Sequence, residues 1–363
     1  MQTKRIEYID ALRGFTMFLV VFAHVWTFGY HVEDKPDTFA TVLTNFFLVL
    51  FFFISGFVAY KKDRSWALPD TARLLKNKAI QLLTPSIFFC ALFCWWQGYG
   101  IDAAFAPANA GYWFTIHLFY FFVFYSLTNI LMPKRLGGVK NDVLLLLVAF
   151  IIFAISYSHV QIERTQIGAD LFHYLGMKNW RYYIFFIVGV LIRKHFNGFV
   201  QLTDNKYAMA ISILGFFGMV FYADHIDFPM WKPLNMLIYG MLSIIVIFTF
   251  FRKYESSFQG TTKLGYAMQY IGRRTMDIYM IHYFLLPRNM DFVGQFFTEH
   301  VNPSLEFFVT SIIALLVILL SLIMGNVIRL SPLLAHYLLG AKNDLAADYL
   351  PPVEDIQLLL DDE

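Results

Sequence analysis

Long apolar stretches alternate with short polar segments along the whole chain. Most approach or exceed the ~20 residues that a helix needs to cross the ~30 Å hydrocarbon core of a bilayer. Lysine, proline and glycine mark the segments between them, as is usual for short loops. The pattern predicts an all-α integral membrane protein with about ten transmembrane helices in one bundle, at residues 8–29, 40–60, 79–98, 112–132, 143–160, 181–196, 206–223, 232–251, 275–293 and 306–329.

The distribution of lysine and arginine predicts the orientation of these helices, because positive residues concentrate in the cytoplasmic loops of membrane proteins. If the N-terminus is cytoplasmic, 22 of the 28 Lys and Arg residues lie in cytoplasmic segments. With an even number of spans, both termini are then cytoplasmic, and we expect a multi-pass protein of the cell inner membrane. Residues 1–330 are expected to form the membrane domain, followed by a cytoplasmic C-terminal segment with an acidic tail at 331–363.

The composition excludes an ordinary soluble domain. Charged residues make up 15% of the chain, against about 25% in soluble domains, and the mean hydropathy is +0.55. The two cysteines, Cys90 and Cys94, lie one turn apart in an apolar run, which is typical of packing residues. A metal site would need more ligands. We therefore expect a lipid bilayer around the protein, no metal, and no nucleic-acid partner.

Three ionisable residues, Asp10, Arg13 and His24, lie in the first predicted helix. A charged side chain at the bilayer centre costs about 2.5–3.5 kcal/mol on insertion scales, so such residues indicate function. Arg13 and His24 are eleven positions apart, which at ~100° and ~1.5 Å per residue places them on one face about 16 Å apart. Simpler interpretations are that Arg13 reaches the membrane surface and that His24 hydrogen-bonds another helix. Asp10 either pairs with Arg13 or caps the helix.

The segment R-G-F-T-M-F-L-V-V-F-A-H, after the lead-in I-D-A-L-R-G, resembles the first helix of the membrane acyltransferase-3 family. The resemblance implies an enzyme that transfers an acyl group, chiefly acetyl, from cytoplasmic acyl-CoA to a hydroxyl of a cell-surface glycan or glycolipid. It also implies that His24 acts as general base, or accepts the acyl group covalently. Arg13 would contact the acyl-CoA donor.

Two further phrases resemble those of the family on the donor side. The second span ends F-F-F-I-S-G-F, in which Gly56 is interpreted as a packing residue, and Ser55 either packs or lines an acyl tunnel. The third span follows a basic run that either anchors the cytoplasmic side or binds CoA phosphates, at Arg73, Lys76 and Lys78. The family usually has an arginine where this chain has Gln81, and Lys78 is a partial substitute.

Aromatic and imidazole residues open two later spans. G-Y-W-F-T-I-H resembles the family's fourth helix, and I-G-R-R-T-M-D-I-Y-M-I-H-Y resembles its closing signature of Gly, Tyr and His. The resemblance implies substrate-binding roles for Trp113, His117, Tyr279 and His282. The simpler interpretations are an interfacial anchor for Trp113 and a structural hydrogen bond for His282. Tyr279 and His282 are expected to share a helix face.

Two other functions account for ionisable residues inside a membrane. A transporter or flippase for a glycan intermediate would need them equally, but it would have no reason to depend on acyl-CoA. A transmembrane sugar N-acetyltransferase carries a similar Leu-Arg-Gly phrase in its first helix. The sequence leaves the acceptor, the acyl chain length and the oligomeric state open.

Overall fold

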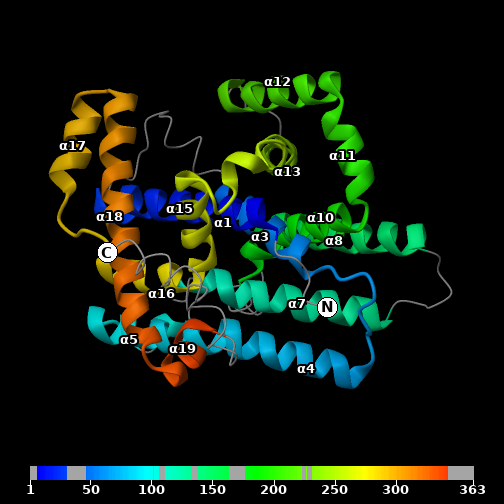
Figure 1. Cartoon of the computed structure of the whole chain (residues 1–363), viewed down its shortest axis with the longest axis horizontal. Helices are drawn as coiled ribbons and strands as arrows, with labels where there is room; N and C mark the ends of the chain where they lie inside the picture. Colours follow the sequence, from blue (N-terminus) through cyan, green and yellow to red (C-terminus); the bar gives the residue numbers. More distant parts are fainter. Residues whose placement is uncertain are drawn as a thin grey trace, which may run out of the picture.

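The computed structural model describes residues 6–30, 46–100, 102–105, 111–131, 138–162, 176–222, 226 and 231–341. These residues form helices and turns without any β-strand, so the predicted all-α class is confirmed for them (Figure 1). The helices are α1 (Glu7–His24), η1 (Val25–Gly29), α3 (Phe47–Ala59), α4 (Leu68–Lys78), η2 (Ala79–Leu83), α5 (Thr84–Gln97), α6 (Asp102–Phe105), α7 (Trp113–Leu131), α8 (Gly138–Ile162), η4 (Met177–Tyr182), α10 (Tyr183–Lys194), α11 (Phe196–Asp204), α12 (Lys206–Tyr222), α13 (Trp231–Ser243), η6 (Ile244–Phe248), α14 (Thr249–Lys253), η7 (Glu255–Phe258), α15 (Lys263–Arg273), α16 (Thr275–Leu285), α17 (Asp291–Glu299), α18 (Pro303–Arg329) and α19 (Pro332–Leu339).

Six helices in the described part are long and apolar enough to cross a membrane, which supports a multi-pass membrane protein. A seventh is counted if η4–α10 and α11, which meet at a 93° bend, form one span. The bounds of two predicted spans, the third and the ninth, differ from those of the observed helices. The third is continuous with the preceding basic run, as one span over Leu68–Gln97. The ninth stops at Leu285, because Pro287 prevents the helix from continuing. The count of ten and the side of the termini remain predictions.

Helix α1 lies inside the bundle, where α3, α15, α16 and α18 surround it (Figure 1). Its contact with α15 depends on two glycines. A Cβ added at Gly14 would overlap the carbonyl oxygen of Met268, and one added at Gly272 would overlap that of Asp10. The two backbones therefore touch directly, as small residues permit between membrane helices.

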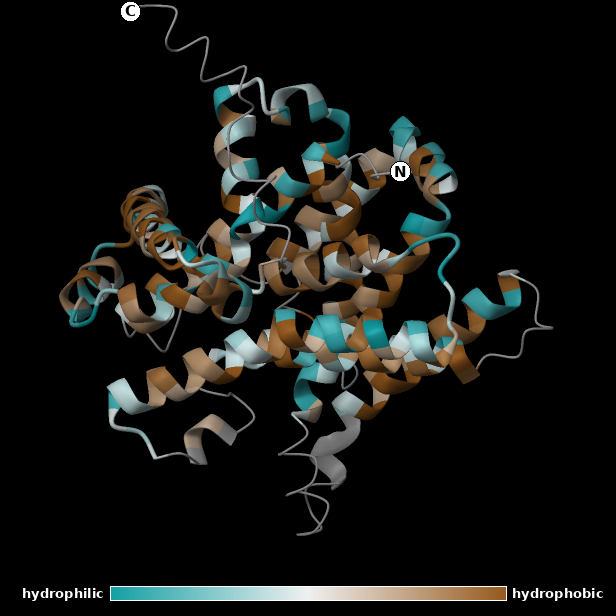
Figure 2. Ribbon diagram, turned by 60° about the horizontal axis from the view of Figure 1, so that its bottom comes forward, coloured by the Kyte–Doolittle hydropathy of each residue, from teal (hydrophilic) through white to brown (hydrophobic). Residues whose placement is uncertain are grey.

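The pair α3 and α10 repeats this arrangement. A Cβ at Gly56 would overlap the carbonyl oxygen of Phe186, and a Cβ at Gly189 would overlap that of Phe53. The packing role predicted for Gly56 is thus confirmed. Phenylalanine rings fill the space around this contact, and Figure 2 shows the resulting brown, apolar stretches in the central helices. Two pairs of helices, α1 with α15 and α3 with α10, are thus held in direct backbone contact.

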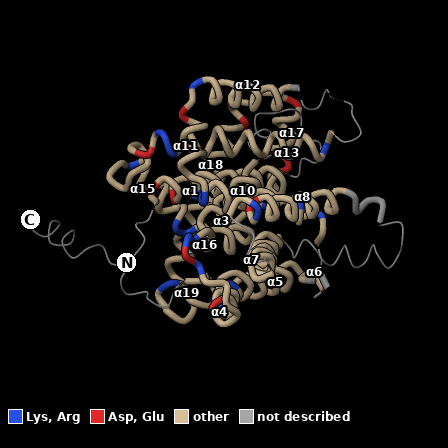
Figure 3. The backbone as a smooth tube through the Cα atoms, turned by 90° about the vertical axis from the view of Figure 1, so that its right-hand side faces the viewer, with Lys and Arg blue, Asp and Glu red and all other residues tan. Residues whose placement is uncertain are grey.

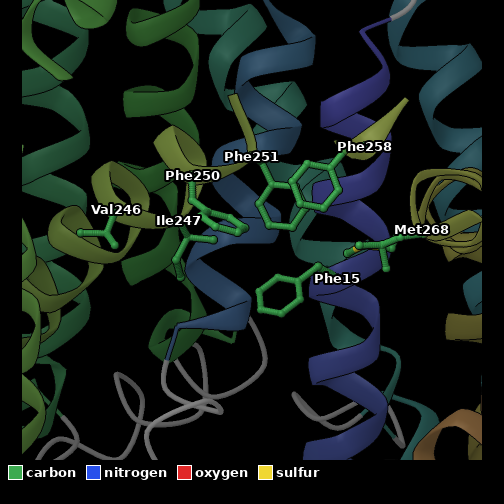
Figure 4. A pocket seen from close by; sticks show the side chains of 8 residues that line it. Phe15, Val246, Ile247, Phe250, Phe251, Phe258 and Met268 are labelled. Atoms are coloured by element: carbon green, nitrogen blue, oxygen red, sulfur yellow. The ribbon is translucent and has the colours of Figure 1, made fainter. Parts of the chain in front are cut away.

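An apolar pocket of about 430 Å³ lies between α1, η6, α14, η7 and α15 (Figure 4). Apolar side chains line it, from Phe15, Val246, Ile247, Phe250, Phe251, Phe258, Leu264 and Met268. Phe15 follows Arg13 by two residues, and at about 100° per residue their side chains project from nearly opposite sides of α1. The pocket therefore lies on the opposite face of α1 from the ionisable residues.

Candidate active site

The central feature of the site is a pair of histidines from α1 and α16. Nδ1 of His24 lies 2.8 Å from Nε2 of His282, and the two rings have centroids 5.0 Å apart and planes 9° from parallel. His282 is completely buried, whereas His24 is half-buried. The expected interhelical hydrogen bond of His24 is thus present, and its partner is the second histidine of the predicted site.

The partners of His282 assign the protons of both rings. Nδ1 of His282 lies 2.9 Å from the carbonyl oxygens of both Ile278 and Tyr279. Carbonyl oxygens only accept, so Nδ1 carries the proton, and in a neutral ring Nε2 is then the acceptor. His24 must donate from Nδ1 to that acceptor. The lone pair of the His24 ring is consequently on Nε2, the nitrogen turned away from His282.

Local helix geometry places His24 where α1 changes pitch. The residue ends the α-helical part, and the π-helix η1 begins at Val25. π-Helical turns are rare and often occur at functional sites. No sequence signal marks this change of pitch, because η1 consists of ordinary apolar residues and Thr27.

Tyrosines cover the histidine pair. The ring of Tyr283 lies 5.0 Å from that of His24 and 4.2 Å from that of His282. The hydroxyls of Tyr279 and Tyr283 both donate to the carbonyl of Gly111, at 3.0 and 3.2 Å. Tyr279, predicted to bind substrate, therefore joins α16 to the residues before α7. Sequence analysis missed Tyr283 because its role depends on a contact with a residue 172 positions away.

Arg13 lies at the other end of the contact between α1 and α16. Its guanidinium donates to the hydroxyl of Thr275 at 3.1 Å and lies 3.8 Å from the Asp10 carboxylate. Of the two roles predicted for Asp10, pairing with Arg13 is the one observed, because the start of α1 has no side-chain cap. The Arg13 side chain is 36% exposed, so it remains accessible to a ligand.

A buried ionic cluster on the same turn of α16 as Thr275, the partner of Arg13, was not predicted. Asp277 of α16 is completely buried and accepts hydrogen bonds from Arg274 at 3.1 Å and from Arg329 of α18 at 2.6 Å through each of two nitrogens. Such a bidentate pair is strong and directional. In Figure 3, blue and red segments accordingly meet near α16, while α3, α5 and α7 are tan.

The predicted donor-side residues are spread over two helices. Arg73 and Lys76 are exposed on α4, whereas Lys78 lies 4.6 Å above the ring of Phe122 and donates to Gln81 at 3.5 Å. The Lys78 ammonium thus lies beside the position where the family usually has arginine. Ser55 donates to the Phe51 carbonyl of its own helix at 2.8 Å and is half-buried.

Trp113 and His117 form a separate group at the start of α7. The nitrogens of His117 lie 2.9 Å from the Trp113 carbonyl and 3.1 Å from the Gly176 carbonyl, which joins α7 to the turn before η4. The ring of Phe114 separates them from Tyr279, with its centroid 6.3 Å from Trp113 and 5.7 Å from Tyr279. Of the four predicted substrate-binding residues, His282 therefore contacts His24 directly, and Tyr279 contacts His282, with ring centroids 6.0 Å apart.

Comparison with known proteins gives one match. The model of the acyltransferase-3 family, described as an acyltransferase domain, matches residues 6–323 and therefore contains both histidines, Arg13 and Asp277. No curated protein and no solved structure matches the chain significantly. In the described residues, no three His, Cys, Asp or Glu side chains are grouped so as to hold a metal ion. The chain belongs to the acyltransferase-3 family and is a membrane acyltransferase.

Proposed function

We propose that this protein transfers an acetyl group from cytoplasmic acyl-CoA to a hydroxyl of a cell-surface glycan or glycolipid, in the cell inner membrane. The observation that carries the proposal is the bond between His24 and His282, because it leaves an unprotonated imidazole nitrogen at the α–π junction. Residues 1–330 are the catalytic membrane domain in this proposal, and 331–363 a cytoplasmic segment.

In the proposed reaction, His24 is the general base. Its Nε2 takes the proton of the acceptor hydroxyl as the oxygen attacks the thioester carbonyl. The tetrahedral intermediate then collapses with loss of CoA thiolate, which receives that proton from the His24 imidazolium. His282 accepts from Nδ1 throughout, so it holds the ring in the productive tautomer and stabilises the imidazolium. A covalent acyl-His24 intermediate is the alternative route.

The donor is proposed to enter at the Arg13 end of α1. CoA is polyanionic, and Arg13 is a partly exposed cation about 16 Å from His24 by helix rise. Arg73, Lys76 and Lys78 would add positive charge at the same face of the membrane, and Ser55 would line the acyl path. Trp113 and His117 are proposed to contact the acceptor from α7.

Acetyl transfer by the purified protein tests this function. Radiolabelled acetyl-CoA is supplied with a glycan or glycolipid extract, and His24→Ala is compared with wild type. Loss of at least 99% of transfer, with an unchanged melting temperature, is expected because general-base catalysis contributes about 10²–10⁴-fold. Transfer at the wild-type rate would refute the assignment of His24. Unfolding of the variant would instead support a purely structural hydrogen bond.

Sealed vesicles with the cytoplasmic face outward distinguish transfer across the bilayer from transport. Acetyl-CoA added outside should label an acceptor enclosed in the lumen, and His24→Ala vesicles should not. Labelling only when donor and acceptor share the outside would contradict transfer across the membrane. Movement of unmodified glycan without acetylation would show a transporter or flippase.

A further inference from the structure

An exposed cation follows the histidine pair at the end of α16 opposite Arg13. Arg288 is in the turn between α16 and α17, six residues after His282, and is exposed to solvent. In the described part of the chain it has no carboxylate partner. The positive φ of 62° at Asn289 turns the backbone immediately after it. Because Arg288 is exposed, its guanidinium is accessible to a ligand.

An aromatic platform holds this guanidinium in place. The Arg288 carbon Cζ lies 3.9 Å from the ring centroid of Trp96 on α5, which is 43% exposed. The ring of Phe284 stacks on Trp96 at 5.2 Å, with planes 27° apart. Stacking on an aromatic face orients an arginine without using its N–H donors. These donors point outward in the plane of the guanidinium, where they can hydrogen-bond a planar or tetrahedral anion.

The platform is joined rigidly to the candidate active site. The backbone N–H of Leu286 donates to the carbonyl of His282 at 2.9 Å, and Pro287 packs against Gly29 at the end of η1. A chain of ring contacts also links Trp96 to Phe93, Phe93 to Tyr283, and Tyr283 to His24, with centroids 6.1, 5.9 and 5.0 Å apart. One continuous set of packed residues therefore joins Arg288 to the histidine pair.

The position of Arg288 also shows which substrate it would meet. Arg13 contacts Thr275 at the start of α16, whereas His24 contacts His282 near its end, so α1 and α16 run in parallel. The donor phosphates belong at the Arg13 end. Arg288 lies beyond the histidines, on the acceptor side.

We propose that Arg288, held by Trp96, binds an anionic group of the acceptor, so that the acceptor is an acidic glycan or glycolipid whose carboxylate or phosphate lies near the hydroxyl that is acylated. This inference rests on the acyl transfer proposed above. A guanidinium grips either anion through two N–H groups. An interfacial anchor, the structural alternative, would affect charged and neutral acceptors alike.

Three small sugars serve as probes for the purified full-length protein with acetyl-CoA: methyl glucoside, methyl glucuronide and glucose 1-phosphate. The first is neutral, the second carries a carboxylate and the third a phosphate. For each sugar, acetyl transfer and equilibrium binding are measured on wild type, Arg288→Gln, Arg288→Lys and Lys232→Gln. Lys232 is a matched control, because it is an exposed cation at the start of α13.

Wild type and Lys232→Gln are expected to prefer a charged sugar roughly tenfold, as a charge-assisted bidentate contact allows. Arg288→Gln should reduce the preference to about one, and Arg288→Lys should keep part of it. The better charged probe identifies carboxylate or phosphate.

Equal binding of charged and neutral sugars by wild type, or a preference that survives in Arg288→Gln, would overturn the inference. So would an equal loss for all three sugars, which indicates an anchor. If charged sugars bind through Arg288 but the wild-type protein does not transfer acetyl to any sugar, the proposed acyl transfer is wrong while the anion site stands.

Discussion

Replacement of His282 tests how the histidine pair works, because three substitutions change its hydrogen bond in different ways. Leucine fills the buried space without any polar atom. Glutamine carries an amide oxygen at the distance of Nε2 from the backbone, so it can still accept from Nδ1 of His24. Asparagine carries its amide at the distance of Nδ1, one bond too short. The backbone carbonyls that His282 contacts remain bonded within α16 in every variant.

The size of the effect follows from the bond that is lost. A hydrogen bond to a charged group contributes about 1.5–3 kcal/mol, and the His24 ring is charged only after it has taken the acceptor proton. The bond therefore stabilises the transition state more than the resting enzyme, and its loss should reduce kcat. At about 1.4 kcal/mol per factor of ten, His282→Leu and His282→Asn should lower kcat by roughly 10–150-fold.

Steady-state acetyl transfer at saturating acceptor gives kcat and the KM for acetyl-CoA separately. His282→Leu should lower kcat and leave the KM for acetyl-CoA nearly unchanged, because the donor binds at the other end of α16. His282→Gln should retain most of kcat. Melting temperatures of the purified variants provide the control for folding.

Two results would refute this reasoning. Wild-type kcat in His282→Leu would mean that His24 needs no orienting partner. Equal loss in His282→Gln and His282→Leu, both folded, would mean that the acceptor at Nε2 is not what matters, and the proton assignment of the pair would be wrong.

Three further predictions concern the helices around the site. Gly272→Ala should lower the free energy of unfolding by about 1–3 kcal/mol in a thermal or denaturant assay, because its Cβ would overlap the α1 backbone. Gly198→Ala is the control, since the space around Gly198 is open, and equal melting temperatures of the two variants would contradict the prediction. Asp277→Asn should lower the free energy of unfolding by about 3–5 kcal/mol, because it removes the buried negative charge that pairs with Arg274 and Arg329; an unchanged melting temperature would contradict this. Arg13→Ala should raise the KM for acetyl-CoA by about tenfold and Arg13→Lys by less, as a phosphate contact requires; wild-type KM in both would leave Arg13 a membrane anchor.

Much of the site was predictable because it depends on spacing within one helix. The eleven-residue interval of Arg13 and His24 predicted a shared face, and both indeed contact α16. The Gly56 contact was predictable because small residues in apolar helices have few other uses. For His282 the sequence predicted a substrate-binding role or a structural hydrogen bond, but it did not predict that the partner is His24.

Contacts between distant segments were not predictable. In the sequence Arg329 is only a basic residue at the end of an apolar span, and the packing of α18 on α16 is what brings it to Asp277. The lengths of the spans also differ, because η1, η2 and η6 change pitch inside apolar runs and the 93° bend divides another. Hydropathy averages over such changes and cannot locate them. The predicted acidic tail and residues 31–45 lie outside the described residues.

The packing of the site helices favours an enzyme over an alternating-access transporter. Transporters of that kind rock one structural repeat against another around a central site. Here α1 meets α15, and α3 meets α10, through backbone contacts so close that no Cβ fits between them. Helices in direct backbone contact cannot move easily along each other. In addition, no internal repeat is evident in the sequence. A fixed pair of parallel helices, with Arg13 and His24 held against α16 at either end, suits a donor that stays in place while only its acyl group is passed on.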